Sequence, residues 1–391
     1  MMKMLAKFLK VLLIIVLSFI ALIYGGVFLG HKVIFPEPYS KLPTIQPAAD
    51  GTLTLGVQPN APSTIEGYTE LLAGQIKKYN EIASSVWPGS ETGGQSAVIE
   101  EIESKRFWFI SPDGAASEIS EDTALSYGFT RNAYFGGFDT YNGGMYLAVA
   151  EGDLQNYLLF QKYLHVGTYD AFITFTHELF HMKEQTKWAD SGSLENEARE
   201  EFLDDTPARA KRVMLQKQLL KAINANADKQ LILEALSTYE DYKTQFPVDY
   251  KNSIPTDRSE GTAYYFELIT SLYSAYPQQI KTEDDLYRAL ALLSTREDIY
   301  VDYGLVAEGY NIGGFACILM DMQGLNWKES LVNNAEATPI QMLADYFEGE
   351  QLPPAAEITQ KEIDETAAKI QQAGEDAGPY LLFRSLYEML F

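Results

Sequence analysis

The chain has 391 residues, 46% of them apolar, and a net charge of −24 from 54 acidic and 30 basic residues. This length and composition allow a large core. The charge excludes nucleic acid as an expected partner, because binding it needs a basic face. The one cysteine, Cys317, lies in the apolar run GGFACILM and is predicted to be a small buried hydrophobe, not a catalytic thiol.

The N-terminus is predicted to anchor the protein in a membrane. Residues 1–10 contain three lysines and no acid, and residues 11–30 run without a charge. A helix of that length rises roughly 30 Å, which matches one hydrocarbon core. Lysines before the span predict a cytoplasmic N-terminus and a single-pass protein of the cell membrane with its other residues outside. A cleaved signal peptide is the alternative, but the run is long for one and no A-x-A-like cleavage site follows.

Composition divides the chain into an anchor, a linker and an ectodomain. Residues 1–32 hold the basic tip and the anchor, and the proline-rich residues 33–62 are expected to be an extended linker. The ectodomain, residues 63–391, is expected to be α+β and mostly α, with a small antiparallel sheet followed by a helical bundle. Its parts are residues 63–152, residues 153–350 with an inserted helical hairpin at 206–246, and residues 351–391 with a C-terminal helix.

The ectodomain begins with a predicted helix and two strand-like stretches. Ser63 is a candidate N-cap for a helix whose apolar residues recur at helical spacing up to Trp87. SAVIEEIESKRFWFI and GGMYLAVAEG are typical of strands. Further on, Thr206 is a candidate cap with Pro207 at the first helical position, and Pro247 is expected to end a helix before a polar loop.

The stretch FTHELFHMKEQ, residues 175–185, places two of the chain's four histidines four positions apart. On a helix from about Asp170 through Trp188, four residues advance about 400°, so His177 and His181 point the same way. Two such imidazoles can bind one zinc ion, and Glu178 can hold a water beside it and take its proton. A pair of surface or core histidines is the alternative, which the concentration of histidine on one turn disfavours.

A catalytic zinc site needs a third protein ligand and an open position. No third histidine follows at the metzincin spacing, so a carboxylate is expected. ENEAREEFLDD, residues 195–205, offers six acids including Glu200, but acids this dense satisfy almost any spacing rule. SEGTAYYFE offers Glu260, followed by small residues that let a helix approach another backbone closely. Glu260 is favoured, and Glu200 stays as the alternative.

HELFH followed by EGTAYY resembles the gluzincin metallopeptidases, in which a glutamate opening an E-G-x-A-x-Y-like helix completes the zinc site. The resemblance covers residues 165–325 in order of elements. It implies a zincin-like bundle, with His177, His181 and Glu260 as zinc ligands and Glu178 as general base. The segment before Glu260 is far longer than in the aminopeptidase branch, and the hairpin predicted at 206–246 is assigned as the insertion.

The aminopeptidase branch also has a G-x-M-E-N strand before its H-E-x-x-H helix. In this chain GGMYL, residues 143–147, carries Tyr146 in place of the glutamate that binds a substrate amine, which argues against aminopeptidase specificity. Two possibilities stay open for this strand. It is either an edge strand that pairs with an extended peptide or an ordinary hairpin strand.

Other residues are candidates for supporting roles at the site. Attack by water places negative charge on the carbonyl oxygen, and a donor besides zinc usually stabilises it. Tyr310 and His165 are candidates, and Tyr310 lies where related gluzincins often supply a tyrosine. Glu267, two turns after Glu260, can hydrogen-bond a ligand histidine, although an ion pair is the more ordinary role for it.

These patterns favour a membrane-tethered, extracytoplasmic Zn²⁺ peptidase that hydrolyses peptide or protein substrates with Glu178 as general base. Two other classes stay open. The ectodomain can be a catalytically silent gluzincin-like scaffold or binding module, or it can be a metal-dependent hydrolase of a non-peptide amide.

Overall fold

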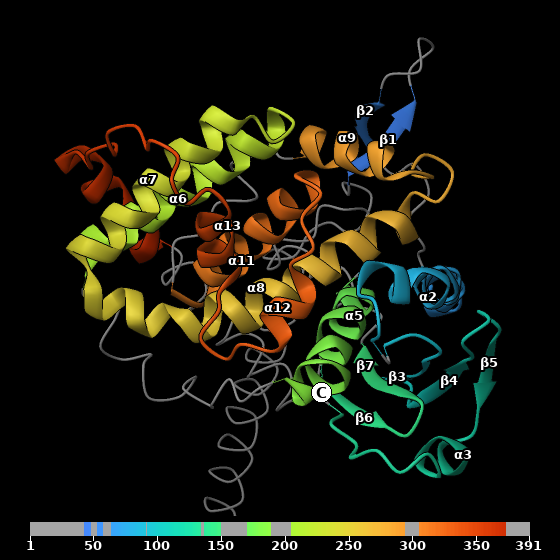
Figure 1. Cartoon of the computed structure of the whole chain (residues 1–391). Helices are drawn as coiled ribbons and strands as arrows, with labels where there is room; N and C mark the ends of the chain where they lie inside the picture. Colours follow the sequence, from blue (N-terminus) through green and yellow to red (C-terminus); the bar gives the residue numbers. More distant parts are fainter. Residues whose placement is uncertain are drawn as a thin grey trace, which may run out of the picture. The chain divides into compact units, whose positions relative to one another are not determined.

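The fold is given by a computed structural model that describes residues 43–47, 53–57, 64–90, 92–133, 137–149, 170–188, 205–293 and 305–372 (Figure 1). The predicted anchor at 11–30, the candidate donor His165 and the alternative ligand Glu200 lie outside these ranges. Within them, no helix is long and apolar enough to cross a membrane. Part of the expected linker forms a hairpin, in which β1 (Pro43–Pro47) pairs antiparallel with β2 (Leu53–Val57).

The two stretches predicted as strands lie in a five-stranded sheet. Its strands are β3 (Ser96–Glu101), β4 (Arg106–Ile110), β5 (Ala116–Ile119), β6 (Phe138–Tyr141) and β7 (Gly144–Val149). A turn divides the first predicted stretch into β3 and β4, β5 and β6 were not predicted, and the pairing is not all antiparallel. The order is β5-β4-β3-β7-β6, and β3 runs parallel to β7 while the other pairs are antiparallel. The sheet is therefore mixed, because an antiparallel unit of three strands (β3, β4 and β5) and the β6–β7 hairpin are joined through the parallel pair β3 and β7.

Strand β7 is not an edge strand, since β6 covers its outer side. The hairpin between them turns at Asn142 and Gly143, and Gly143 has φ +97°, a backbone conformation that glycine adopts without steric cost. This turn pairs Tyr141 with Gly144 and puts β6 at the edge of the sheet. The ordinary hairpin alternative holds for β7.

The two faces of the sheet pack against different elements. Met145 and Leu147 of β7 join the main core together with α2 (Ile65–Val86) and α5 (Asp170–Lys183). Tyr146 points to the opposite face, where its ring stacks on Phe129 at 4.3 Å and its hydroxyl donates to Glu100 at 2.5 Å. Tyr146 is therefore turned away from the face that packs on the histidine helix.

The rest of the described chain is helical, which confirms the mostly α expectation (Figure 1). The further elements are α3 (Glu121–Leu125), η2 (Gln185–Lys187), α6 (Thr206–Asn224), α7 (Lys229–Gln245), α8 (Pro247–Ala275), α9 (Glu283–Leu293), α11 (Leu305–Met322), α12 (Lys328–Val332), α13 (Pro339–Tyr346) and a C-terminal helix over 360–372. Helices α6 and α7 form the predicted hairpin. Cys317 of α11 is fully buried, as predicted. All of these elements belong to one unit, residues 39–369, apart from the last residues of the C-terminal helix.

Three helix starts differ from the predicted ones. The N-cap of α2 is Thr64, not Ser63, and the N-cap of α6 is Asp205, one residue before Thr206. Pro247 does not precede a loop, because it opens α8 directly after α7. Proline suits a first turn because the N–H that it lacks has no partner there.

Helix α8 runs through the region expected to be a polar loop, with Pro255 inside it. A proline in a helix interior removes one backbone hydrogen bond. Here the polar residues around Pro255, which include Asp257 and Arg258, are buried in tertiary contacts. Those contacts outweigh the local preference for a break.

Glycines let α8 and α11 approach backbone to backbone. A Cβ atom on Gly261 would lie 2.5 Å from Cα of Gly313, and one on Gly313 would lie 2.0 Å from the carbonyl oxygen of Asp257. Real Cβ atoms do not come that close, so neither position accepts a side chain without movement. The small residue after Glu260 therefore serves contact with α11, not with the histidine helix as the sequence suggested.

Candidate metal centre

The orientation of the two histidines on helix α5 is set by the opposite face of the helix, which packs in the core. Phe172, Phe175 and Leu179 lie at helical spacing and are fully buried, whereas Met182 is 47% exposed and lies outside the core. With that face fixed, His177 and His181 project together, and their ring centroids are 4.6 Å apart.

Helix α8 brings Glu260 to the two imidazoles. Nε2 of His177 lies 2.9 Å from Nε2 of His181 and 3.1 Å from Oε2 of Glu260, and Nε2 of His181 lies 3.4 Å from the same oxygen. Ligands about 2.0 Å from a tetrahedral zinc ion are about 3.3 Å apart from one another. The three atoms thus form a triangle of the size that three corners of a zinc tetrahedron require, and they are the one such group in the described residues.

The outer nitrogen of His177 is held by a second carboxylate. Nδ1 of His177 lies 2.9 Å from Oε2 of Glu267, and both side chains are 7% exposed. A carboxylate accepts hydrogen bonds, so the imidazole donates from Nδ1. In the neutral ring Nε2 then carries a lone pair, and that lone pair faces Glu260.

The outer nitrogen of His181 is held by Gln185. Nδ1 of His181 lies 2.8 Å from Oε1 of Gln185. The Gln185 amide nitrogen donates to the carbonyl oxygen of Ser259 at 2.7 Å, and since a carbonyl only accepts, the amide orientation is fixed. Nδ1 of His181 is therefore the donor, and its Nε2 also carries a lone pair toward Glu260.

Three acceptor atoms consequently converge with no hydrogen between them when both rings are neutral. Such a cluster needs a cation, which is either an added proton or a metal ion. Without a metal, burial lowers the pKa of His177, but Glu260 and Glu267 outweigh burial and raise it to about 10. Burial likewise opposes ionisation of Glu260, yet its hydrogen bonds with His177 and His181 hold its pKa well below the usual range. Two imidazole nitrogens and one carboxylate oxygen are a donor set that occurs at catalytic zinc sites.

Glu178 and Tyr310 border the cluster. The ring of Tyr310 lies parallel to that of His177, with centroids 5.3 Å apart and planes 7° apart. Burial raises the pKa of Tyr310, and the charges of Glu260 and Glu178 raise it further, so its hydroxyl stays protonated and able to donate. Glu178 is half-buried and has no hydrogen bond or ion pair in the described part of the chain.

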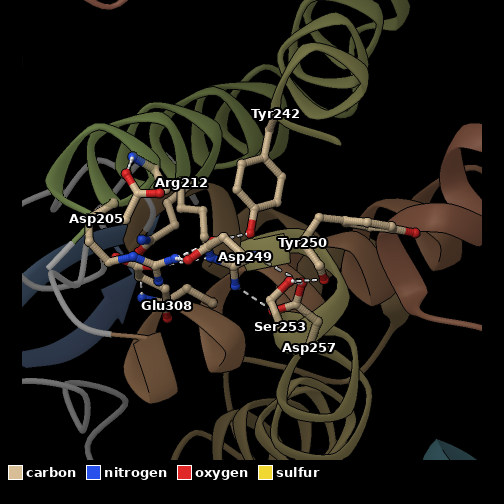
Figure 2. A network of polar contacts seen from close by, with 12 residues as sticks. Asp205, Arg212, Tyr242, Asp249, Tyr250, Ser253, Asp257 and Glu308 are labelled. Carbon is tan, nitrogen blue, oxygen red and sulfur yellow. Dashed lines mark hydrogen bonds and ion pairs between the residues drawn. The ribbon is translucent and has the colours of Figure 1, made fainter. Parts of the chain in front are cut away.

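A buried charge network connects α6 with α8 and α11, the helices that carry Glu260 and Tyr310 (Figure 2). Arg212 of α6 donates from Nε to Oε2 of Glu308 at 2.9 Å and from its terminal nitrogens to Asp257. Arg209 donates to Glu308 and to Asp249. Asp257 lies three residues before Glu260 on α8, and Glu308 lies two residues before Tyr310 on α11. The hairpin α6–α7 is thereby tied to α8, which carries Glu260, and to α11, which carries Tyr310.

The structure brings together His177, His181, Glu260 and Tyr310, with Glu267 at the outer side of His177. Among the six acids of residues 195–205, Asp205 is described and caps α6 by accepting from the backbone N–H of Ala208 at 3.3 Å. Gln185 was missed by the sequence analysis. Its position four residues after His181, one helical turn along, is the signal that could have found it.

Comparison of this chain with protein-family models, with curated proteins and with solved structures finds no match. The chemistry of the cluster is therefore the basis on which a function is proposed.

Proposed function

We propose that this protein is a zinc-dependent peptidase whose ligands are His177, His181 and Glu260. The observation that carries the proposal is the set of three lone pairs that face one another at 2.9–3.4 Å with both outer imidazole nitrogens already committed. Without a metal, an added proton on His177 holds the cluster together, and a bound zinc ion would take the place of that proton. The side chain of His181 is 19% exposed, so solvent reaches this side of the cluster.

The residues of the chain divide the chemistry between them. Zinc bound at this site would polarise a carbonyl oxygen and acidify a neighbouring water. Glu178 acts as the general base, because it is next to His177, partly exposed and free of partners in the described residues. It takes the proton of the attacking water and delivers it to the leaving amine. Tyr310 donates a hydrogen bond from its hydroxyl to the carbonyl oxygen, where negative charge develops.

The proposal extends to the setting of the enzyme. Residues 11–30 anchor the chain in the cell membrane, and the ectodomain acts on peptides or proteins outside the cytoplasm. Tyr146 stands where the resemblance to aminopeptidases implies an amine-binding glutamate, and it faces away from α5, which argues against aminopeptidase specificity.

Metal analysis combined with Glu178→Gln tests this function. The full chain in detergent is expected to hold about one zinc per molecule and to cleave a mixture of internally quenched peptides. Glu178→Gln should keep the zinc and lose cleavage, and Glu70→Gln, an exposed position on α2, should keep both. Zinc binding without cleavage in the wild type would favour the scaffold alternative. Cleavage of simple amides but not of peptides would favour the non-peptide hydrolase.

A further inference from the structure

One side chain connects the second histidine to the segment that presents Glu260. Gln185 lies in η2, directly after α5, and its amide lies between His181 and two residues of α8. Those two residues, Ser259 and Thr262, flank Glu260 in the sequence S-E-G-T. The contact therefore ties the end of one site helix to the ligand-bearing turn of the other.

Every hydrogen-bonding position of the Gln185 amide is used. Nε2 donates to the carbonyl oxygen of Ser259 at 2.7 Å and to Oγ1 of Thr262 at 2.9 Å. Oε1 accepts from Nδ1 of His181 at 2.8 Å and from Oγ of Ser259 at 3.1 Å. Two donors and two acceptors are all that an amide side chain has.

The amide cannot turn over without losing these partners. The Thr262 hydroxyl donates its own proton to the carbonyl oxygen of Arg258 at 2.8 Å, so toward Gln185 it can only accept. A flipped amide would aim its oxygen at two acceptors. It would also aim its nitrogen at Nδ1 of His181 and so impose the tautomer that puts a hydrogen on Nε2, the atom that faces Glu260.

We propose that Gln185 is a positioning residue that selects the metal-binding tautomer of His181 and fixes the angle of its ring. This inference rests on the proposed metal site, which defines what the tautomer is for. Gln185 acts through His181 and does not contact the ion. Gln185 can select the tautomer because Ser259 and Thr262 of α8 hold its amide in one orientation.

Gln185→Met tests the proposal, since methionine has a similar length and no hydrogen-bonding amide. Loss of a partner behind a metal ligand typically weakens binding by about 10–100-fold, and we expect the zinc dissociation constant to rise by that factor. Thr186→Ala, at the exposed next residue, is the control and should bind zinc as the wild type does. Circular dichroism and thermal melting of the metal-free proteins verify that each variant is folded.

The imidazole tautomer is a second readout that a merely structural role would not move. Nitrogen–proton correlation spectra of the metal-free protein, recorded where His181 is neutral, should show the proton on Nδ1 in the wild type. Gln185→Met should show a share of molecules with the proton on Nε2. Thr262→Val, which removes an amide partner, should move in the same direction, while Thr262→Ser, which keeps the hydroxyl, should match the wild type.

The outcomes separate this inference from the proposed function. If the wild type binds no zinc, the metal site itself is wrong. If the wild type binds zinc and folded Gln185→Met binds it equally well with the same His181 tautomer, the site stands and the role of Gln185 is overturned. Equal behaviour of Thr262→Val and Thr262→Ser would overturn the part assigned to α8.

Discussion

Nδ1 of His177 lies 2.9 Å from Oε2 of Glu267, while Nε2 of the same ring lies 3.1 Å from Oε2 of Glu260. Both carboxylates belong to α8, seven residues apart, which is two turns and about 10.5 Å along the axis. One helix thus supplies both a proposed ligand and the acceptor that orients the opposite side of the histidine. Helix α8 therefore contacts both nitrogens of the His177 imidazole, through Glu267 and Glu260.

Replacement of Glu267 should weaken metal binding without touching the ion. Glu267→Leu removes the acceptor for Nδ1–H, and we expect the zinc dissociation constant to rise by about 10–100-fold. Glu267→Gln keeps an acceptor oxygen without the charge, so its loss should be smaller. Competition with a chromophoric chelator measures both values, and equal affinity of Glu267→Leu and wild type would show that the contact is not needed.

Zinc binding should expel a proton from His177. The pKa of about 10 keeps this histidine protonated in the metal-free protein at pH 8, and a metal ligand must be deprotonated. Titration calorimetry in two buffers with different ionisation enthalpies should report about one proton released per zinc, and the apparent affinity should rise about tenfold per pH unit below pH 10. Release of no proton would contradict the protonated state assigned to His177.

The raised pKa of His177 also predicts how the stability of the metal-free protein depends on pH. The folded pKa of His177 is above the ordinary 6.5, so the protonated ring stabilises the fold. This contribution is fully present below about pH 6.5 and is lost as the pH rises through about 10. Unfolding by denaturant across this range, with His177→Gln as the reference, measures it. Identical pH profiles for the two proteins would contradict the prediction.

The contact of α8 with α11 should tolerate no side chain. Gly313→Ala puts a Cβ atom 2.0 Å from the Asp257 carbonyl oxygen, and overpacking of this kind costs about 1–3 kcal/mol or more. Gly74→Ala is the matched control, because a Cβ atom on Gly74 of α2 would meet no described atom of another part of the chain within 4 Å, and alanine there should stabilise the helix by about 0.5–1 kcal/mol. Thermal unfolding distinguishes the two, and a neutral Gly313→Ala would mean that the helices separate easily.

Local patterns in the sequence were sufficient to predict helices over the two motifs of the candidate site, HELFH and EGTAYY. The His177–His181 spacing on one helix was predicted because helical periodicity is a property of neighbouring residues. Convergence of Glu260, 79 positions after His181, rested on its small neighbours, and the structure brings it to the site although Gly261 itself contacts α11.

The features that sequence did not predict depend on partners far along the chain. The parallel pairing of β3 with β7 joins a three-stranded antiparallel unit to the β6–β7 hairpin, and the local sequence of neither part predicts it. The helix through Pro255 is maintained by buried charges on α6 and α11 that no local propensity reveals. The orientation of the Gln185 amide is set by its contact with Ser259, which lies 74 positions further along the chain.

Glu308 should make the charge network pH-dependent. Five buried groups, two arginines and three acids, leave one negative charge unbalanced when all are ionised, and Oε1 of Glu308 has no hydrogen-bond partner among the described residues. Burial, opposed by Arg209 and Arg212, raises the pKa of Glu308 from 4.5 to about 7. Its protonated form therefore favours the folded state, and this contribution is complete below about pH 4.5 and lost as the pH rises through about 7.

Glu308→Gln tests this dependence, because the amide stays neutral at every pH. The wild type should lose stability relative to the variant as the pH rises from about 4.5 to about 7, at up to about 1.4 kcal/mol per pH unit. Glu336→Gln, at a solvent-accessible position before α13, is the control. A difference that does not change with pH would mean that Glu308 is ionised throughout.

Anomalous diffraction at the zinc edge, from crystals of the protein grown with zinc, tests the metal centre most directly. A single strong peak is predicted about 2.0–2.2 Å from Nε2 of His177, Nε2 of His181 and Oε2 of Glu260. A zinc peak bound by another acid in place of Glu260, or no peak between the two imidazoles, would contradict the site and the hydrolytic function proposed from it.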